Sequence, residues 1–204
     1  SLQTCSAVMP TVLDVRVDGA LHHLTDSARL GADLRWDVAT GDLSALGRYL
    51  DLKEVRFPRM VLHADTRLRD ASKLFADALL TEHGPRSDGQ GGRVRLVGDF
   101  DTKTMAYRAK TRITNLQLHD FLPKDSLYLL TASAQLSGRG TDMLRNDSRL
   151  QALLDIDHLG YASWDLDSIH ADARLEKGIA SLEMDSRNDL LGLQGCVDAV
   201  ISER

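Results

Sequence analysis

Hydrophobic and polar residues alternate along most of this chain, which is the pattern of β-strands with one apolar and one wet face. The stretch IHADARLEKGIASLEM, residues 169–184, shows the pattern plainly. Its alternation runs to Leu175, breaks at Glu176-Lys177-Gly178 and resumes from Ala180. Because glycine favours a turn, this stretch is predicted to form a β-hairpin.

The same period of two recurs from one end of the chain to the other. It is found around residues 13–17, 28–38, 60–68, 94–100, 105–113, 130–136, 152–156 and 191–201. Short polar links separate these segments. Repeated alternation of this kind predicts an all-β fold, built on a mostly antiparallel sheet that is wetted on one side.

Two segments depart from the alternation, so one or two short helices are expected. Residues 70–80 place Ala71, Leu74 and Phe75 on one helical face, with Asp70 as the N-cap. Residues 42–50 are a shorter helical candidate. Residues 82–93, rich in glycine and charge, predict a loop and a possible soft break within a unit that otherwise spans residues 1–204.

The composition of the chain limits which classes of partner it can bind. The chain has 204 residues and a net charge of −5, which argues against a nucleic-acid partner because phosphate binding needs a basic surface. No apolar run approaches the roughly 18 residues of a membrane span, and no signal peptide is visible. The chain opens and closes in mid-pattern, so it is expected to be a segment of a longer protein.

The two cysteines, Cys5 and Cys196, stand near opposite ends of the chain. Their spacing matches neither a metal site nor a redox pair. Two unrelated thiols are the favoured interpretation, with a long-range disulfide as the alternative.

No set of residues forms a recognisable active site, so the chain is expected to be neither an enzyme nor a cofactor-binding or metal-binding protein. In Asp155-Ile156-Asp157-His158, alternation places the aspartates on the polar face and the histidine on the other, unless a bulge intervenes. His63 and Asp65 share a face but lack a third ligand.

Several other segments are interpreted as structural. His22-His23 begins a turn, and the glycine-rich stretches 89–92 and 138–140 predict turns because neither continues as a phosphate-binding loop.

The apolar faces carry many alanines among the leucines, for example Ala64, Ala134 and Ala173. Such a face fills little volume, whereas a native core is close-packed. It therefore suits either a thin closed sandwich or a groove whose second layer is a ligand. The residues expected to line that groove are Leu30, Ala32, Leu34, Leu62, Ala64, Leu96, Tyr107, Ala109, Leu130, Ala132, Ala134, Leu136, Leu154, Ile156, Ile169, Ala171, Ala173, Leu175, Leu182, Leu193 and Val197.

Three stretches together resemble the AsmA-like and TamB-like proteins of the Gram-negative envelope. They are NLQLHDFLPKDSLYLLTASAQLSGRGTDM (115–143), LDSIHADARLEKGIASLEMDSRNDLLGLQGCVDA (166–199) and, in style, LDVRVDGALHHLTDSARLGADLRWDVATGDLSAL (13–46). The shared features are the strand-turn-strand repeat and the SxNDLLxLxG phrase. The motifs are degenerate and cover most of the chain, least so at residues 70–93.

The resemblance implies an elongated, curved sheet of U-shaped section with a hydrophobic trough. It also implies a periplasmic location, a parent anchored in the inner membrane, and phospholipid carried between the inner and outer membranes. Neighbouring segments of the same parent, and possible outer-membrane assembly proteins, would be its protein partners.

Three other interpretations remain open. The chain is a structural module that aids outer-membrane protein biogenesis by β-strand pairing, or a closed β-sandwich interaction domain, or a polysaccharide-acting enzyme with Asp155 and Asp157 as its acid pair. Sparse tryptophan and tyrosine count against the last.

Overall fold

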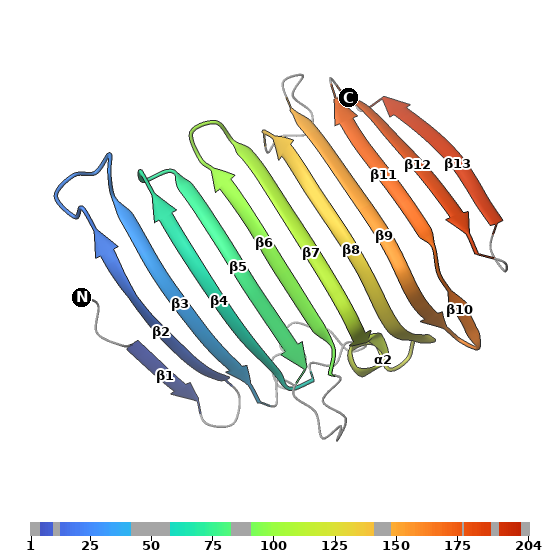
Figure 1. The fold of residues 1–204 in the computed structure, drawn as a ribbon, viewed down its shortest axis with the longest axis horizontal. Helices are drawn as coiled ribbons and strands as arrows, with labels where there is room; N and C mark the ends of the chain where they lie inside the picture. The colour runs from blue at the N-terminus through green and yellow to red at the C-terminus, as the bar shows by residue number, and fades with distance from the viewer. Residues whose placement is uncertain are drawn as a thin grey trace.

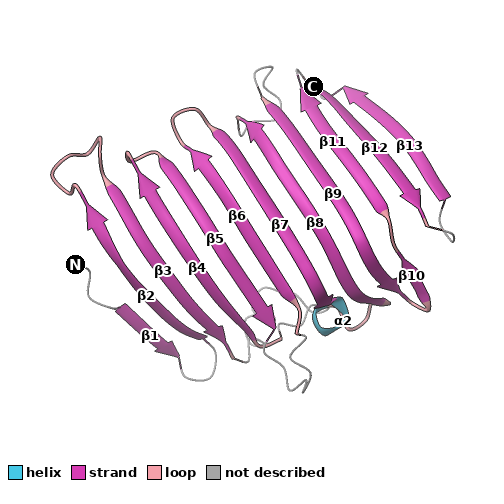
Figure 2. Ribbon diagram, viewed as in Figure 1, coloured by secondary structure: helices cyan, strands magenta, loops and turns pink. Residues whose placement is uncertain are grey.

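The computed structural model describes residues 5–9, 13–41, 58–82, 91–140, 148–176, 178–188 and 192–200. Within these ranges the chain forms one sheet of thirteen strands and one short helix. Figure 1 shows the strands side by side in one layer, and Figure 2 shows how little of the described chain lies outside them. The all-β class is confirmed, with one helix where one or two were expected.

The elements follow one another in this order: β1 (Cys5–Met9), β2 (Leu13–His22), β3 (Gly31–Thr40), β4 (Met60–Arg69), β5 (Lys73–Glu82), β6 (Arg93–Asp101), β7 (Ala106–Gln117), α2 (Leu118–Phe121), β8 (Leu127–Arg139), β9 (Arg149–Tyr161), β10 (Trp164–Leu166), β11 (Ile169–Glu176), β12 (Ile179–Arg187) and β13 (Gly192–Val200).

The sheet is an antiparallel meander. Twelve strands pair in sequence order from β1 to β13, and the short β10 pairs with β9 off this path. The first and last described strands, β1 and β13, therefore form the two edges, which lie far apart in Figure 1. Cys5 is in the edge strand β1 and Cys196 is in the opposite edge strand β13, and Cys196 is free.

The described residues supply no second layer. Among them only two hydrophobic residues are buried, Ala132 at 2% and Leu175 at 4% relative exposure. A closed sandwich of this length would bury a row of large side chains between its sheets. The sheet is open, so the closed-sandwich interpretation does not describe this part of the chain. The U-shaped section stays a prediction.

The helix predicted for residues 70–80 is wrong. Asp70 and Ala71 form a turn, with φ of 50° and 52°, and β5 begins at Lys73. The Ser72 N–H donates to the Arg69 carbonyl at 3.1 Å across this turn. The pattern misled because Phe75 and Leu79 lie on the polar face of β5, and apolar residues on both faces imitate helical spacing.

The other departures from alternation are settled only in part. The helical candidate at 42–50 lies outside the described residues, whereas helix α2, at 118–121, was not predicted. Residues 83–90 of the predicted loop also lie outside the description. The flanking strands β5 and β6 pair from Lys73–Asp101 to Thr81–Arg93, so the sheet continues across the position of the soft break.

The predicted hairpin at 169–184 is confirmed as β11 and β12. Its paired residues run from Ile169–Ser186 to Glu176–Ile179, and Gly178 has a φ of 75°. The predicted turn at 138–140 is correct only for Gly140, with a φ of 81°. Gly138 lies within β8 opposite Tyr107, where an added Cβ would come within 2.5 Å of both the Tyr107 hydroxyl and the Arg149 carbonyl oxygen.

The turn between β4 and β5 gives a direct test of this correction. Alanine with positive φ costs about 1–2 kcal/mol, a cost that glycine avoids. We expect Ala71→Gly to raise the free energy of unfolding by about 1 kcal/mol in urea denaturation. As the control, Ala76→Gly in extended β5 should lower it. A less stable Ala71→Gly variant would contradict the described turn.

Candidate functional site

The register brings the expected apolar residues onto one face of the sheet. Of the 21 residues predicted to line a groove, twenty lie in strands at positions that share this face, which we call the apolar face. Leu30 lies one residue before β3. Outside the local register shifts of β7, β8 and β9, each strand stays in one register with its neighbour. A slip of one residue would move the hydrophobic residues of a strand to the other face of the sheet.

Four rows of cross-strand neighbours run across the apolar face from β2 to β13. The two central rows are Val17, Trp36, Ala64, Ala78, Leu96, Thr111, Ala134, Leu154, Ala171, Met184, Gly195, and Gly19, Leu34, Thr66, Ala76, Gly98, Ala109, Leu136, Ala152, Ala173, Leu182, Val197.

Two outer rows flank them. They are Val15, Val38, Leu62, Leu80, Val94, Ile113, Ala132, Ile156, Ile169, Ser186, Leu193, and Leu21, Ala32, Leu68, Leu74, Phe100, Tyr107, Gly138, Leu150, Leu175, Ala180, Ala199.

Small residues concentrate in the central rows. Thirteen of the 22 central positions are Gly, Ala or Thr, against six Gly, Ala or Ser among the 22 outer positions. Neighbouring rows on one face are two residues apart along each strand, or about 7 Å. The face therefore has a middle band with little side-chain volume between two margins of larger side chains.

The apolar face is large and uncovered by the described residues. Leu74, Leu96 and Leu136 on this face are 42%, 40% and 39% exposed. At about 4.8 Å between strands, the eleven strands from β2 to β13 span about 50 Å. The largest apolar patch of a typical monomer covers only about 300–600 Å², so a face of this extent indicates a binding surface.

Two polar side chains on or beside this face are hydrogen-bonded, whereas the buried Ser186 hydroxyl of an outer row has no hydrogen-bond partner among the described residues. The Trp36 Nε1–H donates to the Thr66 hydroxyl at 2.9 Å. At one end of the face, the Glu82 carboxylate accepts from the Gly92 N–H at 3.0 Å and from the Gln117 N–H at 3.3 Å. The two central rows contain no charged residue.

The opposite face carries the charges, and we call it the charged face. Its arginines and histidines bond to aspartates mainly across strands. The pairs include His63–Asp37 at 2.5 Å, Arg35–Asp65 at 3.3 Å, Arg95–Asp77 at 2.8 Å, Arg108–Asp99 at 3.2 Å, His170–Asp155 at 2.6 Å and Arg149–Glu176 at 3.4 Å. Such exposed pairs add little stability individually but keep this face hydrated.

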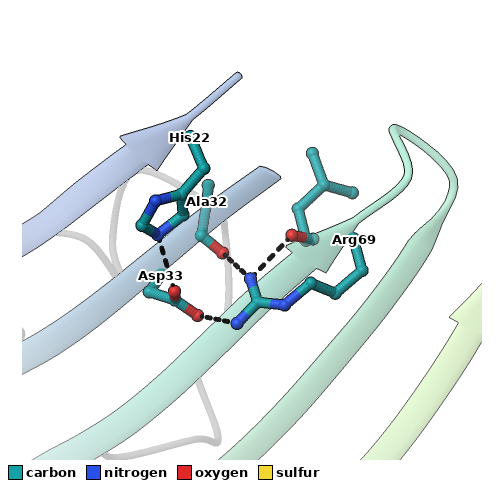
Figure 3. Close-up of polar contacts among 5 residues, drawn as sticks. His22, Ala32, Asp33 and Arg69 are labelled. Atoms are coloured by element: carbon teal, nitrogen blue, oxygen red, sulfur yellow. Dashed lines mark hydrogen bonds and ion pairs between the residues drawn. The ribbon is translucent and has the colours of Figure 1, made fainter. Parts of the chain in front are cut away.

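One cluster on the charged face joins three strands (Figure 3). The Asp33 carboxylate in β3 accepts from Arg69 in β4 at 2.6 Å and bonds His22 in β2 at 2.8 Å. The Arg69 guanidinium also donates to the Leu68 and Ala32 carbonyls at 2.9 and 3.3 Å. The hydrogen bond from Arg69, followed by that from His22, holds the pKa of Asp33 below its usual value.

The candidate ligands at 155–158 do not converge. A register shift in β9 leaves Asp157 out of the pairing and places His158 opposite Thr131, so the predicted opposite-face position of His158 is wrong. Asp155 bonds His170, and Asp157 pairs with Arg112 at 3.0 Å. No group of three potential metal ligands occurs among the described residues.

The other candidate ligand pair, His63 and Asp65, does not act together either. His63 and Asp65 share the charged face, as predicted, but each bonds a different residue of β3, Asp37 and Arg35. His22 bonds Asp33, and His23 has a φ of 55° in the turn, as expected for a structural segment.

Sequence reasoning missed the contribution of β5 to the apolar face. Leu74, Ala76, Ala78 and Leu80 belong to the four rows, but the helix predicted for this stretch concealed them. The period-two spacing of these four residues was the signal that could have found them.

Comparison of the chain with protein-family models, curated proteins and solved structures finds no match. Within the described residues, no helix has the length and apolar character needed to cross a membrane.

The Asp33 cluster yields a prediction for pH titration. Arg69→Gln should raise the pKa of Asp33 toward its usual value, measured by carboxyl NMR. Since the folded-state pKa is lowered, this contact stabilises the fold above the unfolded pKa and stops doing so as pH falls through the folded pKa. The stability difference between wild type and Arg69→Gln should therefore shrink in acid to the part that comes from the Arg69 hydrogen bonds to the Leu68 and Ala32 carbonyls.

The matched control is Arg35→Gln, which removes a cation from the same face while leaving the Asp33 hydrogen bonds intact. An Asp33 pKa that is unchanged by Arg69→Gln, or raised equally by both variants, would contradict the assigned cause.

Proposed function

We propose that this chain is a segment of an AsmA-like or TamB-like envelope protein whose apolar face holds phospholipid acyl chains between the inner and outer membranes. The observation that supports the proposal is the continuous apolar face, which runs from β2 to β13 without a covering layer among the described residues. Phospholipid and neighbouring segments of the parent chain would complete that layer.

The energetic argument rests on transfer from water. Each acyl CH₂ exposed to water costs about 0.8 kcal/mol, so moving a whole lipid tail through water costs on the order of 10 kcal/mol. An apolar surface that continues across eleven strands removes most of this penalty at every position. No cofactor and no chemical step is needed for such transport.

The distribution of side-chain sizes also suits sliding chains. The alanines and glycines of the central rows leave room for extended tails, and the larger aliphatic side chains of the outer rows flank them. Because no deep pocket of aromatic side chains occupies the central rows, a tail would meet shallow, repeated binding minima. The charged face would remain in the aqueous periplasm.

A second candidate function is supported by a different observation. The outer sides of β1 and β13 have no partner strand among the described residues. An open edge can accept an added strand through main-chain hydrogen bonds. An assembly module of this kind would bind outer-membrane protein segments at its edges and would not need lipid on the apolar face.

Native mass spectrometry of the protein purified from a bacterial host, followed by lipid extraction, tests the proposal. We expect phospholipid to co-purify with the wild type. Ala134→Asp and Ala173→Asp place a charge in each central row, so they should remove most of the bound lipid because burying an unpaired carboxylate is costly.

The matched control is Ser133→Asp, which adds the same charge one residue away on the charged face and should retain lipid. Ala134→Leu separates volume from charge, since it fills the central row without adding polarity and should also reduce lipid. Circular dichroism confirms that each variant is folded. A folded wild type without lipid would refute the conduit, and peptide binding by that lipid-free protein would favour the assembly module.

A further inference from the structure

The charged face is interrupted by a small apolar patch formed by Phe75, Leu79 and Val97. They are 42%, 36% and 43% exposed and come from the adjacent strands β5 and β6. The patch is separate from the apolar face, which is on the other side of the same strands. Three large apolar side chains among aspartates and arginines have no role in the proposed lipid surface.

A hollow of about 640 Å³ lies over this patch. Phe75 and Val97 line it, together with the charged residues Arg67, Asp77, Asp99 and Lys110 among others. Sites for small ligands typically enclose about 300–1,000 Å³ and combine an apolar lining with a few polar groups. The hollow has a volume in this range, and its lining combines five uncharged residues, including Phe75 and Val97, with seven charged ones.

Each of the three aspartates of the hollow has an arginine partner, and that of Asp65 is Arg35 at 3.3 Å. Asp77 accepts two hydrogen bonds from Arg95, at 2.8 and 3.2 Å, and Asp99 pairs with Arg108 at 3.2 Å. The bond from Arg95 lowers the pKa of Asp77, to which the nearby charge of Arg67 also contributes. Both carboxylates therefore already have a cationic partner within the protein.

Two cations of the hollow remain available. In the described part of the chain, neither Arg67 nor Lys110 has a hydrogen-bond or ion-pair partner within 4 Å. Arg67 in β4 is directly opposite Phe75, and Lys110 in β7 is directly opposite Val97. The apolar patch is thus flanked on both sides by a positive charge, and the charges left unpaired there are positive.

We propose that this hollow binds a small organic acid with an aromatic or aliphatic body. The body would lie on Phe75 and Val97, and the acid group would pair with Arg67 or Lys110. A neutral or cationic ligand of the same shape would gain the apolar contact but not the ion pair. This site is on the opposite face from the proposed lipid surface, so neither proposal depends on the other.

Anilinonaphthalene sulfonate and its uncharged analogue N-phenylnaphthylamine test the proposal as a matched pair of probes. Their affinities are read from amide NMR shifts at Phe75 and Val97 in a titration of the whole chain. We expect the sulfonate to bind more tightly and to weaken as ionic strength rises, because salt screens exposed charges.

Arg67→Gln and Lys110→Gln should each weaken sulfonate binding about two- to fivefold, the usual range for an exposed ion pair, and leave the neutral probe unaffected. Arg16→Gln removes a cation of the same face far along the sheet and serves as the control. Phe75→Ser should weaken the binding of both probes at this hollow. Leu74→Ser changes the equally exposed neighbour on the apolar face and should leave that binding unchanged.

Two results would overturn the proposal. One is unchanged sulfonate affinity in the folded Arg67→Gln/Lys110→Gln double variant. The other is equal affinity for the charged and uncharged probes at these amides, which would mean that the patch binds apolar surface without selecting an acid. Loss of lipid in the Ala134→Asp variant should not alter either titration.

Discussion

The structure depends on the register of an antiparallel meander. Each strand has a side-chain period of two, so pairing in the observed register places every apolar set on one side and every ion pair on the other. The pairing continues through three register shifts, between Ile113 and Leu116 in β7, between Leu127 and Leu130 in β8, and at the unpaired Asp157 in β9. A sheet with one face as apolar as this needs something other than itself to cover that face.

The two faces differ in how their polar atoms are satisfied. Cross-strand ion pairs such as Arg95–Asp77 keep the charged face hydrated, while Trp36 and Glu82 satisfy their polar atoms within or beside the apolar face. The interruption at Phe75 and Val97 is therefore informative. There, apolar side chains are exposed on the charged face between two cations, Arg67 and Lys110, that have no hydrogen-bond or ion-pair partner within 4 Å among the described residues.

Much of this organisation could be predicted from the sequence, because period-two alternation fixes both the strands and their faces. The hairpin of β11 and β12 and twenty of the 21 expected apolar-face positions follow from it. The strand β5 was missed, since Phe75 and Leu79 on its charged face add a helical spacing to the period-two spacing of its apolar-face residues. The bulge at Asp157 was equally hidden, because pairing with Thr131 and not local pattern decides where His158 lies.

The pairing of each long strand with its neighbours along the chain makes the length of the sheet modular. Contacts are local, so each hairpin depends mainly on the strands beside it, as in solenoid proteins. Gain or loss of one hairpin would change the span by about 10 Å and leave the remaining register intact. Evolution could therefore lengthen or shorten such a sheet in small steps, without redesigning either end.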